Sequence, residues 1–329
     1  MFKAYGQAHI LILGGLGFIG THLTRLLHKA GAKITVVDNF LPDHGANWFN
    51  LEGIRDDITV HVSDIRSKEA MNTLVQGQDY IFNIAAQTSH SDSMKDPYLD
   101  LDINGRGTLN VLEACRHYNS EAKVVFIGTR AYYGSPKILP VTEDAPLNPL
   151  DIYSVNRYAA EQYHLLYNLH YGLKTTSLRI SNLYGPYAQM KHAKYNVLNY
   201  FMRMAIDGQS IKIFGDGLQQ RDYVYVADVA RALALAGLED KSVGEIYNIG
   251  SGEGESFANL VKLIVKTAQS GDYQYCDWPT GSQNFDVGDF IMDISKAQKE
   301  LAWQPEYSLE QGFKETLNFY KAHQSHYWL

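Results

Sequence analysis

The sequence has very little cysteine and no long apolar run. Its two cysteines, Cys115 and Cys276, are too few for a disulfide framework, and neither shows the spacing of a Cys/His metal site. The longest apolar run, around residues 10–19, is broken by glycines and falls short of the roughly 18 residues of a membrane span. No basic stretch followed by a cleavage site opens the chain. These absences predict a protein of the reducing cytoplasm with no membrane partner.

Positive charge is also in deficit. The 29 Lys and Arg residues are outnumbered by 36 Asp and Glu residues, which leaves a net charge of −7. Because binding to a phosphate backbone needs a basic surface, we expect no nucleic-acid partner, although a local basic pocket for one diphosphate stays possible. The 12 histidines include no HxxxH or HxH pair, so no metal site is expected.

The chain does contain enough apolar residues for a large core, since they make up 45% of its 329 residues. Short runs rich in β-branched residues alternate with helix-period segments through the first half. The expected buried strands are His9–Leu13, Lys33–Val37, Ile58–Val62, Tyr80–Ile84, Lys123–Ile127 and Thr175–Ile180. Each is apolar at consecutive positions, which is typical of a parallel sheet covered on both faces. The pattern predicts an α/β fold with a doubly wound parallel sheet of the Rossmann type.

A glycine-rich segment, Gly14–Gly20, follows the first expected strand and opens the first expected helix. Gly14, Gly17 and Gly20 allow a tight turn and close approach of the backbone to a diphosphate at the helix N-terminus. The second strand ends at Asp38, whose carboxylate would accept hydrogen bonds from ribose hydroxyls and repel a 2′-phosphate. No Gly-Lys-Ser/Thr follows, so a triphosphatase loop is excluded. A purely structural turn is the alternative, but the context predicts a bound dinucleotide, NAD rather than NADP.

The character of the sequence changes near residue 180. We predict an NAD-binding Rossmann domain over 1–180, to which a segment of about 224–249 returns as one more helix and strand. A smaller, mixed α/β substrate domain is predicted over 181–329, with helices near Asn196–Ile206 and Leu309–Tyr320. The cleft between two such domains is the default ligand site.

A long loop over 128–150 precedes a helix that is expected to begin near Asp151. This helix carries Tyr153 and Arg157 four residues apart, and therefore on one face. A tyrosine whose pKa falls by roughly three units beside a fixed cation can act as a general acid or base near neutral pH. The other interpretation is a surface tyrosine with Arg157 paired to Glu161, and the spacing alone favours it.

Taken together, the motifs resemble the extended short-chain dehydrogenase/reductase family, specifically its NAD-dependent nucleotide-sugar epimerases and dehydratases of the UDP-glucose 4-epimerase type. The resemblance covers nearly the whole chain. The segments that carry it are Gly14–Gly20, Val36–Asn39, Asp64-Ile65, Asn83–Gln87, Asn104–Thr108, Phe126–Gly134, Tyr153–Arg157, Arg179–Pro186 and Arg221–Tyr223.

The resemblance implies a role for each matching residue. The implied catalytic residues are Thr129, Tyr153 and Arg157. The implied NAD-binding residues are Gly14, Gly17, Phe18, Ile19, Asp38, Asn39, Asp64, Ile65, Ala85, Ala86, Gln87, Asn104, Tyr153 and Arg157. The implied substrate-binding residues are Thr88, Thr129, Asn182, Phe214, Arg221 and Asp286. A homodimer formed by the helices expected over 94–118 and 153–171 is also implied.

Three departures from the family pattern bear on function. Arg157 stands where the family has lysine; it keeps the positive charge, but its planar guanidinium can slow the reaction or move the tyrosine. Arg130 and Ala131 stand where the 4,6-dehydratases carry Asp-Glu, and where uronate decarboxylases carry a glutamate at the second position. Ala131 fits the 4-epimerases. Gln283 stands near the position of a nucleotide-gripping arginine, which leaves the base open.

The implied function is that of a nucleotide-sugar epimerase, an isomerase that inverts C4 of an NDP-hexose through a transient 4-keto sugar. Tyr153 would remove the hydroxyl proton, Thr129 would hydrogen-bond the same oxygen, and Arg157 would hold the nicotinamide ribose and keep Tyr153 ionised. Two alternatives stay open. One is an NAD(P)H-dependent NDP-4-ketohexose reductase, and the other is a catalytically silent NAD-binding protein, for which Arg157 would be the sign.

Overall fold

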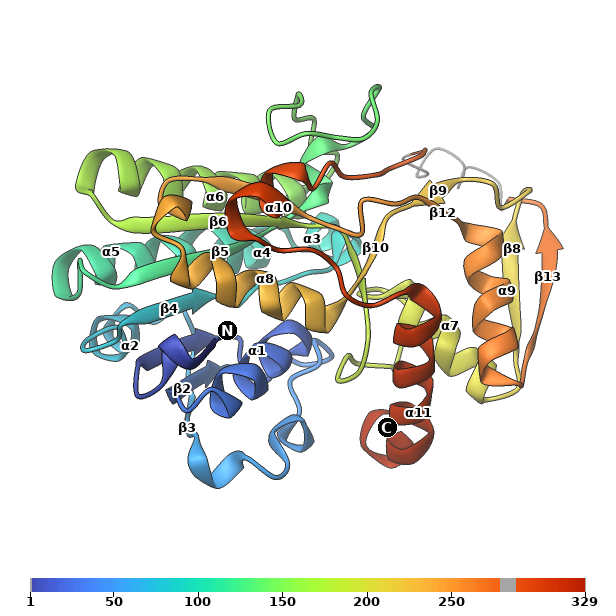
Figure 1. Ribbon diagram of the computed structural model, residues 1–329, viewed down its shortest axis with the longest axis horizontal. Helices are drawn as coiled ribbons and strands as arrows, with labels where there is room; N and C mark the ends of the chain where they lie inside the picture. The colour runs from blue at the N-terminus through green and yellow to red at the C-terminus, as the bar shows by residue number, and fades with distance from the viewer. Residues whose placement is uncertain (1, 279–287, 329) are drawn as a thin grey trace.

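The centre of the protein is a seven-stranded parallel sheet (Figure 1). The computed structural model describes residues 2–278 and 288–328. The strands of the sheet are β1 (His9–Leu13), β2 (Lys33–Asp38), β3 (Thr59–Val62), β4 (Tyr80–Asn83), β5 (Lys123–Thr129), β6 (Lys174–Ile180) and β11 (Ile246–Ile249). They lie in the order β3-β2-β1-β4-β5-β6-β11. The predicted doubly wound fold is confirmed, and the strand order reverses between β1 and β4, where such sheets bind ligands.

Helices cover both faces of the sheet. Helices α1 (Phe18–Lys29) and α8 (Val226–Leu238) pack on one face, and α2 (Lys68–Leu74), α5 (Thr108–Tyr118) and α6 (Ile152–Tyr171) on the other. Neighbouring residues of β1 show why its central positions are apolar in succession. Ile10 and Ile12 enter the core beneath α1 and α8, whereas Leu11 and Leu13 enter the core beneath α2 and α5.

The helix expected over residues 94–118 is not continuous. The segment consists of α3 (His90–Lys95), α4 (Pro97–Asp100), a π-helical turn, η4 (Leu101–Gly107), and α5. Proline 97 has no N–H to continue α3, and the Asp96 side chain instead accepts a hydrogen bond from the N–H of Leu99 at 3.0 Å and starts α4. The prediction of one long helix was therefore wrong, because a helix start signal lies inside it.

A second hydrophobic cluster lies at the right of Figure 1. Its elements are α7 (Val197–Ile206), α9 (Phe257–Ala268), α11 (Leu309–Tyr327), β8 (Ser210–Phe214) and β13 (Asp272–Cys276). The strand pairs β7 (Asn182–Tyr184) with β10 (Tyr223–Tyr225) and β9 (Gln220–Arg221) with β12 (Glu255–Ser256) lie between this cluster and the sheet, and α10 (Ser295–Leu301) precedes α11. The helices expected near 196–206 and 309–320 are present, although α11 runs on to Tyr327.

The boundary near residue 180 stays a prediction, but the returning segment has the expected form. Helix α8 packs beside α1, and β11 pairs in parallel with β6 at the edge of the sheet. Among the helices within residues 2–278 and 288–328, none combines the length and apolarity that a membrane crossing requires.

Candidate active site

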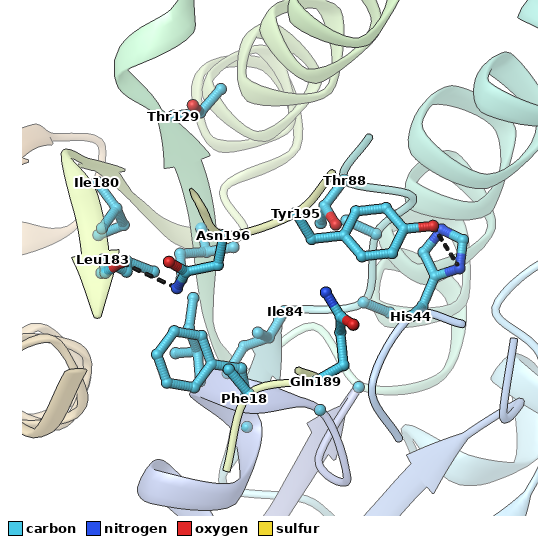
Figure 2. Close-up of a pocket in the computed structure, with 18 of the residues that line it drawn as sticks. Phe18, His44, Ile84, Thr88, Thr129, Ile180, Leu183, Gln189, Tyr195 and Asn196 are labelled. Atoms are coloured by element: carbon cyan, nitrogen blue, oxygen red, sulfur yellow. Dashed lines mark hydrogen bonds between the residues drawn. The ribbon is translucent and has the colours of Figure 1, made fainter. Parts of the chain in front are cut away.

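A cleft of about 450 Å³ opens at the carboxyl ends of the strands, between the sheet and the segment 182–198 (Figure 2). Most of the site residues implied by the sequence line it. They are Gly14, Gly17, Phe18, Ile19, Asp38, Asn39, Asp64, Ile65, Ala85, Ala86, Thr88, Thr129, Tyr153, Arg157 and Asn182. The strand ends thus bring residues from positions 14 to 182 around one cavity.

The turn between β1 and α1 is too tight for side chains. Gly14 has a φ of +82°, and a Cβ atom at Gly20 would stand 2.1 Å from the carbonyl oxygen of Gly14. Helix α1 begins after Gly17, so no side chain caps its first turn. Uncapped N–H groups at a helix N-terminus are suited to binding a phosphate. This turn therefore fits the diphosphate of a dinucleotide.

The carboxylate of Asp38 lines the cleft beside this turn. Its oxygens accept hydrogen bonds from the N–H groups of Leu16 at 3.2 Å and Phe40 at 3.1 Å. Burial raises the pKa of Asp38, and these backbone donors oppose the rise. The next residue, Asn39, donates a hydrogen bond to Asp64 at 2.7 Å, which joins the ends of β2 and β3. A negative carboxylate held in this place fits a ribose with free hydroxyls and disfavours a 2′-phosphate.

Tyr153 lies in the first turn of α6 and is only 8% exposed. The N-cap residue Asp151 accepts a hydrogen bond from the N–H of Ser154 at 2.8 Å, which fixes the start of the helix. Burial raises the pKa of Tyr153, while the charge of Arg157 and a hydrogen bond with Thr129 lower it. Burial is the larger effect, so the expected fall in the pKa of this tyrosine is not found in the protein alone.

Arg157 is buried behind Tyr153, with its guanidinium carbon 4.4 Å from the centre of the Phe126 ring. Its Nη2 donates a hydrogen bond to the carbonyl oxygen of Ile127, and its Nη1 has no partner among the described residues. Glu161 instead forms an ion pair with Arg179 at 2.7 Å. The alternative interpretation, a surface ion pair between Arg157 and Glu161, is therefore wrong. An unpartnered N–H group at the wall of the cleft fits a contact with a cofactor hydroxyl.

Gln87 and Asn104 lie behind the cleft and are not part of its described lining. Both donate hydrogen bonds to the buried carboxylate of Asp100, at 3.0 and 3.1 Å, and Asn156 donates a third at 2.8 Å. This group ties the end of β4 to α4, η4 and α6. The contact of Gln87 and Asn104 with the cofactor stays a prediction.

Two of the implied substrate residues, Phe214 and Arg221, are also outside the described lining. Phe214 packs with its ring centre 5.5 Å from that of Trp278. Arg221, in β9, donates hydrogen bonds to the carbonyl oxygens of Gln220, at 3.0 Å, and Gly288. Asp286 lies outside the residues that the structure describes.

The segment 188–198 supplies lining residues that the sequence did not single out. Gln189, Tyr195 and Asn196 reach into the cavity from it (Figure 2). The ring of Tyr195 lies 4.7 Å from that of His44, which follows β2. The two residues are 151 positions apart, so no local pattern in the sequence points to their contact.

His90 is a further residue that the sequence placed only within a broad segment around Thr88. It lines the cleft, and its ring stands edge-on to the Tyr153 ring, with 4.8 Å between their centres. Its Nδ1 lies 2.6 Å from a carboxylate oxygen of Asp151. Burial raises the pKa of Asp151, but hydrogen bonds from His90 and Ser154 outweigh burial and lower it. His90 thereby holds α3 against the start of α6.

Fold and cleft together define the class of protein. The phosphate-suited turn lies at the switch point of the sheet, and a tyrosine, a threonine and an arginine line the same cavity. This arrangement is that of the short-chain dehydrogenase/reductase fold, with a dinucleotide as cofactor. In comparison with known proteins, the model of the NAD dependent epimerase/dehydratase family matches residues 10–250. The chain belongs to this family, and its cofactor is NAD.

Individual relatives cover nearly the whole chain. A UDP-glucose 4-epimerase of Mycolicibacterium smegmatis is 30% identical over 94% of this chain and 98% of its own. A UDP-N-acetyl-alpha-D-glucosaminuronate decarboxylase of Bacillus cytotoxicus is 31% identical over 94% and 97%. The crystal structure of a UDP-glucose 4-epimerase with UDP-glucose from Thermotoga maritima is 33% identical over 96% and 99%, with a TM-score of 0.87.

Proposed function

We propose that the protein is a nucleotide-sugar 4-epimerase, which inverts C4 of an NDP-hexose through a transient 4-keto sugar. The observation that carries the proposal is that Thr129, Tyr153 and Arg157 line the same cleft as the glycine turn and Asp38. Relatives named UDP-glucose 4-epimerase support the choice of reaction and of UDP as the first nucleotide to test.

The chain's own residues would act on the sugar oxygen. Tyr153, as the phenolate, takes the proton of the C4 hydroxyl, and as the phenol it returns a proton to the C4 oxygen after the ketone is reduced; Thr129 donates a hydrogen bond to the same oxygen. Arg157 supplies a positive charge that favours ionised Tyr153 and an N–H for a ribose hydroxyl. When bound, NAD supplies a hydride acceptor for C4 and a hydride donor for the opposite face of the ketone.

The remaining residues of the site bind the substrate in this proposal. Thr88 contacts the sugar, and Asn182 and Arg221 hold the diphosphate while the sugar turns over. Phe214 and Asp286 contact the nucleoside. Arg and Asn side chains suit diphosphate oxygens because their N–H groups donate hydrogen bonds to anionic acceptors.

Residues 130 and 131 separate epimerisation from the other reactions of the family. Dehydration and decarboxylation need an acid or base beside C5 and C6, and Arg130 with Ala131 supplies no carboxylate there. A 4-ketoreductase is the second candidate, and it would consume reduced cofactor. A silent NAD-binding protein is the third, on the ground that Arg157 replaces lysine.

Proton NMR tests the proposal by following C4 in UDP-, GDP-, CDP- and dTDP-hexoses incubated with the purified protein. We expect inversion of at least one of them without added NAD(P)H, together with NAD that co-purifies with the protein. Turnover only of a 4-keto sugar with stoichiometric NAD(P)H would establish the reductase instead. Tight NAD binding without turnover of any sugar would instead indicate the catalytically silent NAD-binding protein.

We propose further that the protein is a cytoplasmic homodimer, formed through α5, α6 and the elements beside them. Large apolar side chains on α3, α4, η4 and α6 are between 47% and 80% exposed: Met94, Tyr98, Leu101, Leu166 and Leu169. Exposed apolar groups on elements that pack together are typical of a protein interface.

Sedimentation equilibrium tests the dimer. We expect a molar mass twice that of one chain, and Leu169→Arg is expected to shift it to the monomer because the arginine would be buried without a partner. Val62→Arg, at a residue of edge strand β3 that is 65% exposed, is the matched control and should leave the dimer intact. A monomeric wild-type protein would contradict the proposed assembly.

A further inference from the structure

Arg130 lines the cleft and has no role in the proposed mechanism. It follows Thr129, the last residue of β5, and begins the short helix η5 (Arg130–Tyr133). Its Nε donates a hydrogen bond to Oδ1 of Asn182 at 2.8 Å, and its guanidinium carbon lies 5.1 Å from the centre of the Phe290 ring. Two contacts from other parts of the chain therefore hold the guanidinium in place.

The charge of Arg130 has no acidic partner in the part of the chain that the structure describes. Within residues 2–278 and 288–328, no Asp or Glu forms an ion pair with it. The acidic side chain that acts on its charge is Asp222, and both oxygens of this carboxylate already accept hydrogen bonds from Ser251, Gly252 and Met292. Burial, followed by the neighbouring positive charge of Arg221, lowers the pKa of Arg130 to about 10. The guanidinium is thus charged at neutral pH and short of a counter-charge.

The contacts of Asn182 strengthen the case for a ligand on Arg130. Asn182 Oδ1 accepts from Arg130, and its Nδ2 donates to the carbonyl oxygen of Asp222 at 2.8 Å. Asn182 therefore orients Arg130, whose side chain is partly exposed in the wall of the cleft. A cation held in a cleft, with no acidic partner among the described residues, favours an anionic group of the ligand beside it. Such a site is built to receive an anionic group of the ligand.

We propose that Arg130 binds a carboxylate carried by the sugar, and that the substrate is a nucleotide-diphosphate hexuronate. This rests on the proposed function. Arg130 follows Thr129 in the sequence, and Thr129 forms a hydrogen bond with Tyr153. Tyr153 is also close enough to influence the pKa of Arg130. Arg130 therefore lies next to the reacting groups; Asn182 and Arg221, the proposed diphosphate residues, are its other neighbours, and titration with UDP separates the two positions. The planar fork of a guanidinium matches the two oxygens of a carboxylate.

Two probes that differ only at C6, UDP-glucuronate and UDP-glucose, test this assignment. Isothermal titration calorimetry on the NAD-loaded protein gives the affinity for each without requiring turnover. We expect the wild-type protein to bind UDP-glucuronate more tightly. Arg130→Met is expected to weaken binding of UDP-glucuronate roughly 30-fold or more beyond its effect on UDP-glucose. Arg130→Lys keeps the charge without the fork and should recover part of the loss.

Each other outcome overturns the assignment. If wild-type protein does not prefer UDP-glucuronate, or if Arg130→Met weakens both ligands equally, the sugar carboxylate is not the group that Arg130 binds. If Arg130→Met weakens both nucleotide sugars equally, titration with UDP alone shows why. An equal loss of affinity for UDP would mean that Arg130 binds the diphosphate. Because these are binding measurements, an absence of C4 inversion would contradict the proposed function while leaving the preference for the carboxylate readable.

Discussion

Tyr153→Phe is expected to lower kcat for C4 inversion by roughly 100- to 10,000-fold, the usual contribution of a positioned general acid or base. The change removes only the hydroxyl group, and the phenyl ring can still pack against His90, whose ring centre is 4.8 Å away. The NAD content of the purified variant should therefore equal that of the wild type. Initial rates by NMR and cofactor released on denaturation measure the two effects separately.

Tyr163→Phe is the matched control for this change. Tyr163 is a half-buried residue of the same helix, α6, and packs at the edge of the core beneath that helix rather than in the lining of the cleft. Its variant should keep wild-type turnover. Retention of more than about a tenth of the wild-type rate by Tyr153→Phe would show that another group moves the proton, since a general acid or base contributes far more than tenfold.

Glu161→Ala is expected to reduce the free energy of unfolding by about 3–5 kcal/mol, because it leaves a buried guanidinium without its partner. Glu161 is fully buried and accepts hydrogen bonds from Arg179, at 2.7 Å, and from Ser177, at 2.9 Å. Arg179 is only 2% exposed, and water cannot replace the lost carboxylate. The shift of the urea midpoint at constant m-value gives the loss.

An exposed ion pair supplies the control for Glu161. Glu121 pairs with Lys174 at 2.9 Å, but its side chain is 84% exposed. Glu121→Ala should therefore cost less than about 1 kcal/mol. A cost for Glu161→Ala as small as this would mean that Arg179 finds another partner or reaches solvent, and that the pair does not hold α6 to β6.

The sheet was predictable because its signal is local. A strand buried on both faces is apolar at consecutive positions, and β1, with the sequence HILIL, shows this in the four buried residues that follow His9. The helix predicted over 94–118 differs mainly at its start: Asp96 and Pro97 end α3 and begin a helical stretch that runs through α4, η4 and α5 to Tyr118. Met94 and Lys95 belong to α3, because Pro97 has no N–H to continue that helix.

The Arg157 environment shows where local reasoning fails. Arg157 and Glu161 are four residues apart, a spacing that suits an ion pair on any exposed helix. Strand β6 instead brings Arg179 to Glu161, and Arg157 turns to Phe126 and Ile127. The expected fall in the pKa of Tyr153 is opposed by burial, and part of its surroundings, the His90 ring, comes from a segment more than sixty residues earlier in the chain.

The linear order of residues was enough to establish the doubly wound sheet, the glycine turn with Asp38, and the group of Thr129, Tyr153 and Arg157 as a candidate site. These features depend on neighbours within a few positions or on motifs of fixed spacing. Only the tertiary structure shows the contact of His44 with Tyr195 across the cleft. It alone also shows that Arg130 lies beside Asn182 with no acidic partner among the described residues. Both depend on which distant segments meet, because burial and charge balance are properties of a side chain's surroundings in space.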